Sequence, residues 1–417
     1  MKFILIILIL SGCAVFSQSA QPAKGRILFG IDVLIKSDFE VLKGKKVGLL
    51  TNNAGRTKNN ELTAKILNEQ NSFELKALFV PEHGFYTTIP AGKNVQDGNL
   101  FGIPVHSLYN TYKSPKSTLL DSLDILVIDL QDIGVRSYTY ISTMFNTMEI
   151  CAETDLPVLV LDRANPLGGL TVDGNVLEMK WQSFVGKIPV SYIHGCTIGE
   201  LAVMINEEGW LDNNNKGTTK KCDLEVIEMK NWERWMQWED TGYNWYPTSP
   251  HIPTVDAVRG IATLGVFGEL GIFSIGIGTT LPFQYLGAPG LDIEQIETEL
   301  NELKKDGLII SPIKYQPIYG LYSGKKVNGF LLKFEKYNNY LPYSSGFEIF
   351  LKLRKHKPAL FDLNKLKSKN INMFKKVTGT DKLINAMKNN SSEKKIRKLA
   401  NQGLTNFILM RNKYLLY

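Results

Sequence analysis

The sequence predicts an α/β fold built on a parallel β-sheet, because it contains continuous apolar runs of strand length that end in polar clusters. A run that is apolar throughout is typical of a strand buried on both faces, as in parallel sheets. Four such runs occur in the first half of the chain: Lys46–Leu50, Leu75–Val80, Asp124–Leu130 and Leu156–Leu161. Ligands of open α/β sheets bind beyond the carboxyl ends of the strands, so the four polar clusters are expected to meet in one cleft.

Glu82 is the side chain that we expect at the centre of this cleft. It follows the second run and Pro81, and it precedes His83 and the turn residue Gly84. The other clusters supply polar side chains around it, and the amides among them suit the hydroxyl groups of a ligand. These are Asn52 and Asn53 after the first run, Gln131, Asp132 and Arg136 after the third, and Asp162, Arg163 and Asn165 after the fourth.

Tyr138 and Tyr140 suit the wall of a sugar-binding cleft, because a tyrosine ring packs on a sugar face while its hydroxyl bonds outward. They precede a predicted helix that contains Met144–Ala152, and we expect one of the two to pack between helix and sheet instead. Asp162 and Arg163 can form an ion pair that fixes their loop. Ligand binding is the alternative role of these two residues, and the sequence does not decide between the two.

Two further carboxylates are candidates for the site. Glu178 follows the segment Val172–Leu177. Glu200 lies in a predicted helix, Cys196–Gly209, that follows His194, and with Thr197 it matches the T-x-x-E capping box. Helix capping and catalysis therefore compete as explanations of Glu200.

The length of 417 residues indicates two domains. The Pro-rich segment Tyr246–Pro253 is the predicted crossing, which gives a first domain over 21–255 and a second over 256–417. The second half opens with a Gly-rich apolar stretch, Ile261–Phe283. From Leu291 onward the pattern predicts a helix, strands at Leu308–Ile310 and Lys325–Phe334, a helix at Gly346–Lys355 and two Lys-rich helices, without a catalytic cluster.

The net charge of +7 comes largely from the segment between Lys365 and Lys413. A solvated, Lys-rich helical face is the interpretation that we adopt. Nucleic-acid binding is disfavoured, because basic patches interleaved with aromatic residues and a known binding module are both missing from the sequence.

The N-terminus has the form of a signal peptide over residues 1–20, with Lys2 before the apolar run Phe3–Leu10. Leu10-Ser11-Gly12-Cys13 resembles a bacterial lipobox, which would place a lipid anchor at Cys13, whereas Val15-Phe16-Ser17 fits ordinary cleavage. We expect an exported protein, either periplasmic or an outer-membrane-anchored lipoprotein. Cys151, Cys196 and Cys222 form neither a disulfide framework nor a zinc motif.

Glycoside hydrolysis is the chemistry that these residues favour. Serine-hydrolase and zinc-protease motifs are missing from the sequence, and no metal or organic cofactor is implied. Carboxylates, amides, arginines and tyrosines around a cleft suit a sugar, whose hydrolysis needs a proton donor and a second group that stabilises or attacks the reacting carbon. Glu82 is the expected proton donor.

Long motifs in this order resemble the NamZ-like exo-β-N-acetylmuramidases, a glycoside hydrolase family formerly described as a domain of unknown function. The motifs are VGLLTNNAG, LFVPEHGF, DILVIDLQDIGVRSYTYIST, VLVLDRANPLGG, VDGNVLE, HGCTIGELA and the terminal YLLY. The resemblance spans about Gly30 to Tyr417. It implies a Rossmann-like domain with a smaller α+β C-terminal domain and a site between them. It also implies removal of terminal β-1,4-linked N-acetylmuramic acid from peptide-free peptidoglycan fragments in cell-wall recycling.

The same resemblance assigns Glu82 and Glu200 as the catalytic glutamates, with His83 and His194 beside them. Arg136 or Arg163 would bind the lactyl carboxylate of muramic acid. No stable protein partner is inferred. Retaining, inverting and substrate-assisted mechanisms all remain compatible with the sequence.

The chain departs from many relatives at one place. Ser274-Ile275-Gly276-Ile277-Gly278-Thr279 replaces a Ser-Glu-Gly-Arg-Gly-Thr segment, so that an acidic and a basic residue are both isoleucine. We expect this segment to lie behind the substrate-contacting side chains and to be repacked with apolar groups. The alternative function is a non-catalytic, exported lipoprotein that binds muropeptides or sugars.

Overall fold

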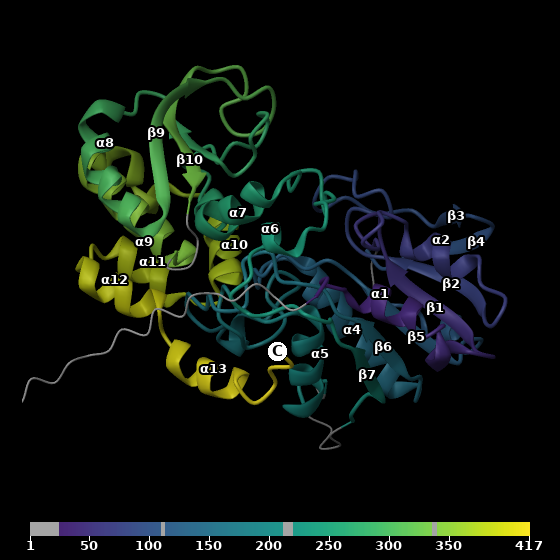
Figure 1. The fold of residues 1–417 in the computed structure, drawn as a ribbon. Helices are drawn as coiled ribbons and strands as arrows, with labels where there is room; N and C mark the ends of the chain where they lie inside the picture. Colours follow the sequence, from purple (N-terminus) through teal and green to yellow (C-terminus); the bar gives the residue numbers. More distant parts are fainter. Residues whose placement is uncertain (1–24, 110–112, 212–219, 336–339) are drawn as a thin grey trace, which may run out of the picture.

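The computed structural model describes residues 25–109, 113–211, 220–335 and 340–417 (Figure 1). The predicted signal peptide and Cys13 lie outside these ranges. No helix within them is both long and apolar enough to cross a membrane. The domain boundary at residue 255 stays a prediction.

A seven-stranded, mostly parallel sheet forms the first half, which confirms the predicted α/β class. Its order is β3-β4-β2-β1-β5-β6-β7, and only the edge strand β3 runs antiparallel. All four apolar runs form strands in its centre. The strands are β1 (Lys46–Thr51), β2 (Glu74–Val80), β3 (Gly98–Leu100), β4 (Ile103–Ser107), β5 (Ile125–Asp129), β6 (Val158–Leu161) and β7 (Leu224–Ile227).

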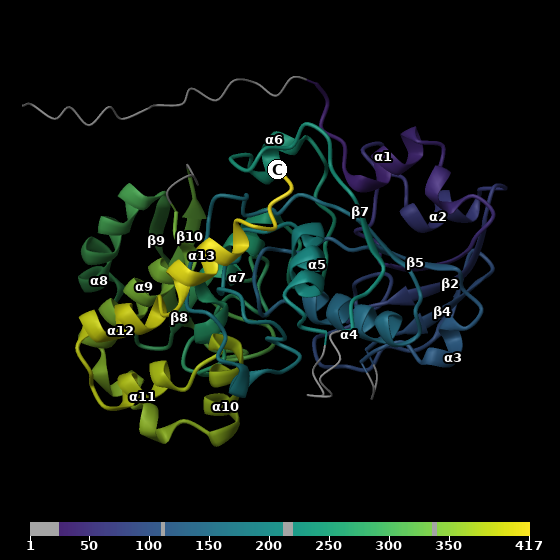
Figure 2. The ribbon, with the colours of Figure 1, turned by 90° about the horizontal axis from the view of Figure 1, so that it is seen from below.

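Alternate residues of the central strands enter two separate apolar cores, since successive side chains of a strand point to opposite faces. Leu50 and Phe79 pack on one face with α4 (Thr139–Glu153) and α5 (Ile198–Glu207). The other face packs against α1 (Gly30–Lys36) and α2 (Thr63–Asn68). Figure 2 shows α1 and α2 on one side of the strands and α4 on the other. Burial on both faces explains why the strands are apolar throughout.

A smaller antiparallel sheet with helices forms the second half, as the predicted fold class requires. Its order is β8-β10-β9, from β8 (Tyr285–Ala288), β9 (Leu308–Tyr315) and β10 (Val327–Phe334). The remaining helices of the described chain are α3 (Ser117–Leu120), α6 (Trp238–Thr241), α7 (Val255–Gly268), α8 (Ile293–Leu300), α9 (Pro342–His356), α10 (Ser368–Thr378), α11 (Lys382–Lys388), α12 (Glu393–Ala400) and α13 (Leu404–Arg411).

The first part of the Gly-rich stretch Ile261–Phe283 belongs to α7, which runs to Gly268 and buries apolar side chains in one of the cores. One prediction for the second half needs correction. The Lys-rich tail forms the helices α10 to α13 rather than two helices, because Gly379 and Gly403 adopt left-handed backbone conformations that end or begin them.

The end of the chain returns to the first half, where α13 lies near α5 (Figures 1 and 2). The Leu416 amide donates to Glu200 Oε1 at 3.0 Å, and the Tyr417 hydroxyl donates to Asp162 Oδ2 at 2.7 Å. Through these hydrogen bonds, the terminal YLLY segment connects the second half of the chain to α5 and to the loop after β6.

Candidate active site

A cavity of about 550 Å³ lies between the two halves of the chain. The first half contributes the loop after β2, the start of α4 and the segment around Phe184. The second half contributes α7, the segment that contains Ile275 and Phe283, and α10. This volume is within the roughly 300–1,000 Å³ of small-molecule sites.

Glu82 lies in this cavity, where the sequence predicted it, and is only 5% exposed. Its Oε1 accepts a hydrogen bond from the Gly92 amide at 2.9 Å, and its Oε2 accepts one from Thr139 Oγ1 at 2.7 Å. Thr139 is the first residue of α4, so the positive end of the helix dipole also faces the carboxyl group. These contacts stabilise negative charge on Glu82.

His83 also lines the cavity, and its backbone is unusual. It has a φ of +75° and is followed by Gly84 at +71°, so the chain turns sharply directly after β2. His83 Nδ1 lies 2.7 Å from the Ile89 carbonyl, which can only accept, so Nδ1 carries the proton. Burial lowers the pKa of this histidine, which leaves Nε2 unprotonated at neutral pH.

Lys113 is held beside Glu82 by two aromatic rings. Its Nζ lies 4.2 Å from the ring centre of Tyr109 and 4.1 Å from that of Phe184. Burial lowers the pKa of Lys113, and the charge of Glu82 opposes this shift. Burial and the same charge raise the pKa of the Tyr109 phenol. Lys376 of α10 lines the cavity as a second lysine.

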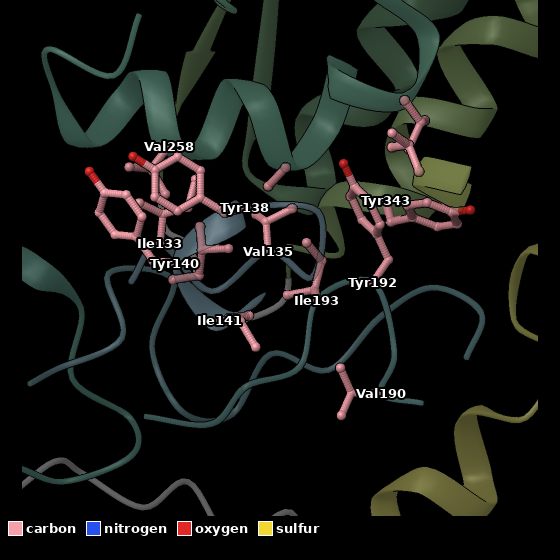
Figure 3. Packing of buried hydrophobic residues seen from close by; sticks show 14 of the residues in the cluster. Ile133, Val135, Tyr138, Tyr140, Ile141, Val190, Tyr192, Ile193, Val258 and Tyr343 are labelled. Atoms are coloured by element: carbon pink, nitrogen blue, oxygen red, sulfur yellow. The ribbon is translucent and has the colours of Figure 1, made fainter. Parts of the chain in front are cut away.

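The structure separates the two predicted tyrosines. Tyr138 lines the cavity and donates its hydroxyl hydrogen to Thr248 Oγ1 at 2.7 Å. Tyr140 is buried in the core, where it accepts a hydrogen bond from Asn52 Nδ2 at 2.7 Å and donates one to the Thr248 carbonyl. Figure 3 shows both rings close to Val258 of α7. One tyrosine therefore packs between helix and sheet, as expected.

Tyr192 contributes another aromatic wall, with its ring centre 4.7 Å from that of Tyr343 (Figure 3). His251 also lines the cavity, and its Nε2 forms a hydrogen bond of 3.1 Å with the Tyr319 hydroxyl. Burial, with a smaller contribution from His83, lowers the pKa of His251. None of these side chains was identified from the sequence.

Most other predicted site residues lie at the carboxyl edge of the sheet but outside the cavity, because they hydrogen-bond to one another and to the backbone. Asn52 binds Tyr140 and the Ala54 amide, and Asn53 binds Arg56. Gln131 donates to the carbonyls of Asp132 and Ala164. Asn165 donates to the Cys196 carbonyl. Their clustering was predicted, but the convergence of all four clusters on one ligand cleft was wrong.

Asp132 and His194 are a buried pair that does not line the cavity. His194 Nε2 lies 3.3 Å from Asp132 Oδ2, and His194 Nδ1 accepts a hydrogen bond from the Cys196 amide at 3.1 Å. Since Nδ1 accepts, the ring proton is on Nε2, which lies near the carboxylate but makes no hydrogen bond among the described residues.

Neither predicted lactyl-binding arginine reaches the cavity. Arg136 is fully buried and donates to the carbonyls of Asn175, Val190, Val377 and Thr378, so that it joins the two halves of the chain. Burial lowers its pKa to about 10. Arg163 forms a bidentate ion pair with Asp129, at 2.5 Å and 2.8 Å.

The predicted ion pair of Asp162 with Arg163 is therefore incorrect. Asp162 instead accepts hydrogen bonds from Thr197, Tyr417 and the Gly199 amide, and burial raises its pKa to about 6. Glu178 also lies outside the cavity, where Lys382 at 2.9 Å, Lys180 and Thr380 surround it. Burial alone would raise the pKa of Glu178, but these partners together lower it.

Glu200 lies outside the cavity and caps α5, in the capping box that the sequence predicts. Its Oε2 accepts from the Thr197 amide at 2.9 Å, and its Oε1 forms an ion pair with Arg234 at 2.6 Å and accepts from the Leu416 amide. All of these contacts are structural.

The Glu200→Gln variant is therefore expected to lower the free energy of unfolding by about 1–3 kcal/mol, since it weakens a buried, charged hydrogen-bond network. We expect its turnover, per folded molecule, to stay near the wild-type value. Chemical denaturation and activity measured on the same preparation test this. Loss of turnover with unchanged stability would instead restore the catalytic assignment of Glu200.

The sequence showed no obvious catalytic cluster in the second half of the chain, yet this half contributes ionisable side chains to the cavity. Glu269, directly after α7, lines the cavity together with Ile275 and Lys376. Ile275 is thus part of the cavity wall, whereas Ile277 packs against the core. A sequence signal for Glu269 did exist: it is the single charged residue in the apolar stretch Ile261–Phe283, where a charge is costly to bury without a purpose.

Within the described residues, no group of three or more His, Cys, Asp or Glu side chains is arranged to hold a metal ion. The side chains that are available for chemistry in the cavity are carboxyl groups, lysines, histidines and aromatic rings.

The comparisons with known proteins identify the same family for both halves of the chain. The family profile described as "Exo-beta-N-acetylmuramidase NamZ, N-terminal" matches residues 47–256, and its C-terminal counterpart matches residues 262–417. Peptidoglycan beta-N-acetylmuramidase NamZ of Bacillus subtilis (strain 168) is 34% identical over 403 residues, which cover 96% of this chain and 94% of that protein.

Two crystal structures of DUF1343 family proteins from Bacteroides fragilis share the fold. One has a TM-score of 0.87 at 35% identity, the other 0.69 at 30%, and each comparison covers 94% of this chain and 99% of the other. The family profile and the B. subtilis relative make the protein a glycoside hydrolase, and the carboxyl groups of the cavity fit that class. The chain belongs to the exo-β-N-acetylmuramidase NamZ family.

Proposed function

We propose that this protein is an exo-β-N-acetylmuramidase that removes terminal β-1,4-linked N-acetylmuramic acid from the non-reducing ends of peptide-free peptidoglycan fragments. The observation that carries the proposal is the buried Glu82 carboxyl in a cavity large enough for one substituted sugar. Membership of the family and the B. subtilis relative named as a peptidoglycan β-N-acetylmuramidase support it.

The muramic acid lactyl group carries a carboxylate, and Lys113 and Lys376 are the cations available to receive it within the cavity. Arg136 and Arg163 are unavailable, because their donors bind backbone carbonyls and Asp129. Lys113 already lies beside Glu82, which leaves Lys376 as the better partner for an added negative charge.

The Lys376→Met variant is expected to raise KM for a muramide about 10-fold or more, since a hydrogen bond to a charged group contributes about 1.5–3 kcal/mol. KM for the matching glucosaminide, which has no carboxylate, is expected to stay unchanged. Steady-state kinetics on both substrates measure the difference. An equal rise in KM on both substrates would contradict recognition of the carboxylate by Lys376.

The reaction itself is tested with the chain from Gln21 to Tyr417 and a chromogenic β-N-acetylmuramide, with the matching glucosaminide beside it. Release from the muramide alone is the expected result. Release from the glucosaminide instead would change the substrate and keep the enzyme class. Release from neither, by folded protein, would support the alternative of a non-catalytic sugar-binding protein.

Export is part of the proposal, supported by the signal-like segment 1–20. Labelling of the full-length chain with a radioactive fatty acid, compared with a Cys13→Ser variant, distinguishes a lipid anchor at Cys13 from ordinary cleavage to a periplasmic form.

A further inference from the structure

Glu269 differs from Glu82, the other acidic side chain of the cavity lining, because its carboxyl group has no polar partner within the described part of the chain. It directly follows the last residue of α7, and the Asn370 side chain of α10 donates to its backbone carbonyl at 2.8 Å, which fixes the end of the helix. Its side chain lines the cavity. Among the described residues, no ion pair or hydrogen bond to its carboxyl group is found.

The surroundings of Glu269 favour the protonated carboxyl group. Burial raises its pKa to about 7. The position at the C-terminal end of a 14-residue helix acts in the same direction, because the negative end of the helix dipole disfavours a carboxylate. Tyr192, its aromatic neighbour on the cavity wall, carries no charge at neutral pH, since burial raises the pKa of this phenol to about 12.

The cations near the cavity do not compensate a charge on Glu269. Lys113 lies between two aromatic rings next to Glu82, and burial keeps the pKa of both His83 and His251 low. Lys376 is on α10, which packs against α7, and forms no ion pair among the described residues. The charged side chains of α9, the other helix on α7, bind partners elsewhere: Glu348, Lys352, Arg354, Lys355 and His356.

Glu82 shows the opposite environment in the same cavity. Both of its oxygens accept hydrogen bonds, the start of α4 faces it, and Lys113 is close by. When two carboxyl groups of one site have environments that favour opposite protonation states, the environments assign the acid and the base.

We propose that Glu269 is the general acid of the hydrolysis and that Glu82 acts as the carboxylate. The sequence assigned proton donation to Glu82, and the contacts of the two side chains reverse that assignment. The inference deepens the proposed exo-muramidase activity and rests on it.

The proton balance of the step is complete without a further reactant. The bond between C1 of the muramic acid and the bridging oxygen breaks, and its electron pair stays on that oxygen, which takes the proton of Glu269. A water oxygen becomes bonded to C1, and the proton that this water loses is taken up by Glu82. Proton exchange with solvent then returns both side chains to their starting states.

The experiment compares Glu269→Gln with wild type on two substrates that differ in their need for a proton. One is the disaccharide of N-acetylmuramic acid β-1,4-linked to N-acetylglucosamine. The other is a dinitrophenyl β-N-acetylmuramide, whose leaving group departs as an anion. We expect kcat/KM to fall about 10²–10⁴-fold on the disaccharide and less than about 10-fold on the dinitrophenyl substrate.

The pH profile provides a second readout. Wild-type kcat/KM on the disaccharide is expected to decline as the pH rises through about 7, where Glu269 loses its proton, and the variant should lack this decline. Glutamine resembles the protonated side chain in shape and charge, so folding should be preserved. Glu269→Asp, which keeps the acid on a shorter side chain, is the second variant and should retain part of the disaccharide activity.

The matched control is Glu348→Gln, which changes a carboxyl group of the same half of the chain outside the cavity, and it should leave both activities unchanged. An equal loss on both substrates, or no loss on the disaccharide, would overturn the role of Glu269. If wild type cleaved neither substrate, the proposed function itself would fail. If wild type cleaved both and Glu269→Gln gave one of these contradicting results, only the role of Glu269 would fail, so the two failures are distinguishable.

Discussion

The Glu82→Gln variant is expected to lose about 10²–10⁴-fold in kcat/KM on every muramide substrate, activated or not. Glutamine retains the shape: its oxygen can still accept from the Gly92 amide, and its NH2 group can donate to Thr139 Oγ1, so the loop after β2 should keep its conformation. What it removes is the negative charge that accepts a proton from the nucleophile. Initial rates on the disaccharide and on the dinitrophenyl substrate measure this loss.

Thermal unfolding of the same preparations controls for structural damage, and the midpoint should stay close to that of wild type. The pattern should differ from that of Glu269→Gln, which spares the activated substrate. Wild-type turnover of the Glu82→Gln protein would show that the carboxylate of Glu82 takes no part in the reaction.

The Arg163→Met variant is expected to destabilise the protein by about 3–5 kcal/mol. It leaves Asp129, which has no exposed surface, as a buried charge without its bidentate partner. Asp129 is the last residue of β5 in the centre of the sheet, so the charge cannot move into solvent. Urea unfolding followed by tryptophan fluorescence measures the change in free energy.

The matched control is Arg397→Met, which removes an ion pair with Glu348 in which the arginine side chain is 45% exposed. Exposed pairs contribute about 0–1 kcal/mol, so this variant should unfold close to wild type. A loss of catalysis in Arg163→Met at unchanged stability would mean that Arg163 acts on the ligand after all.

The sequence was sufficient to predict the central strands of the seven-stranded sheet, because strands that are buried on both faces are apolar throughout. Each of the four apolar runs became a strand, and Glu82 lies in the cavity because the sharp turn at His83 directs the loop there. The edge strand β3 escaped notice, since its three residues are largely exposed and carry no apolar run.

The other polar clusters could not be assigned from sequence, because position along the chain does not tell which partner a side chain binds. Arg136 and Arg163 follow strands as ligand-binding residues do, yet their partners come from residues 190, 377 and 378 and from β5. Glu269 was missed although it is the single charged residue of the apolar stretch Ile261–Phe283. That pattern shows that the residue is unusual, but its position in the cavity follows from the packing of α7, which the sequence does not show.

The contacts of the last four residues have a consequence for biosynthesis. Tyr417 and Leu416 satisfy Asp162 and Glu200, two buried carboxylates of the first half of the chain. Until these residues have emerged from the ribosome, the chain has both carboxylates without those partners. The first half should therefore reach its final stability only once Leu416 and Tyr417 can bind, and chains that stop a few residues before them should be removed by proteases.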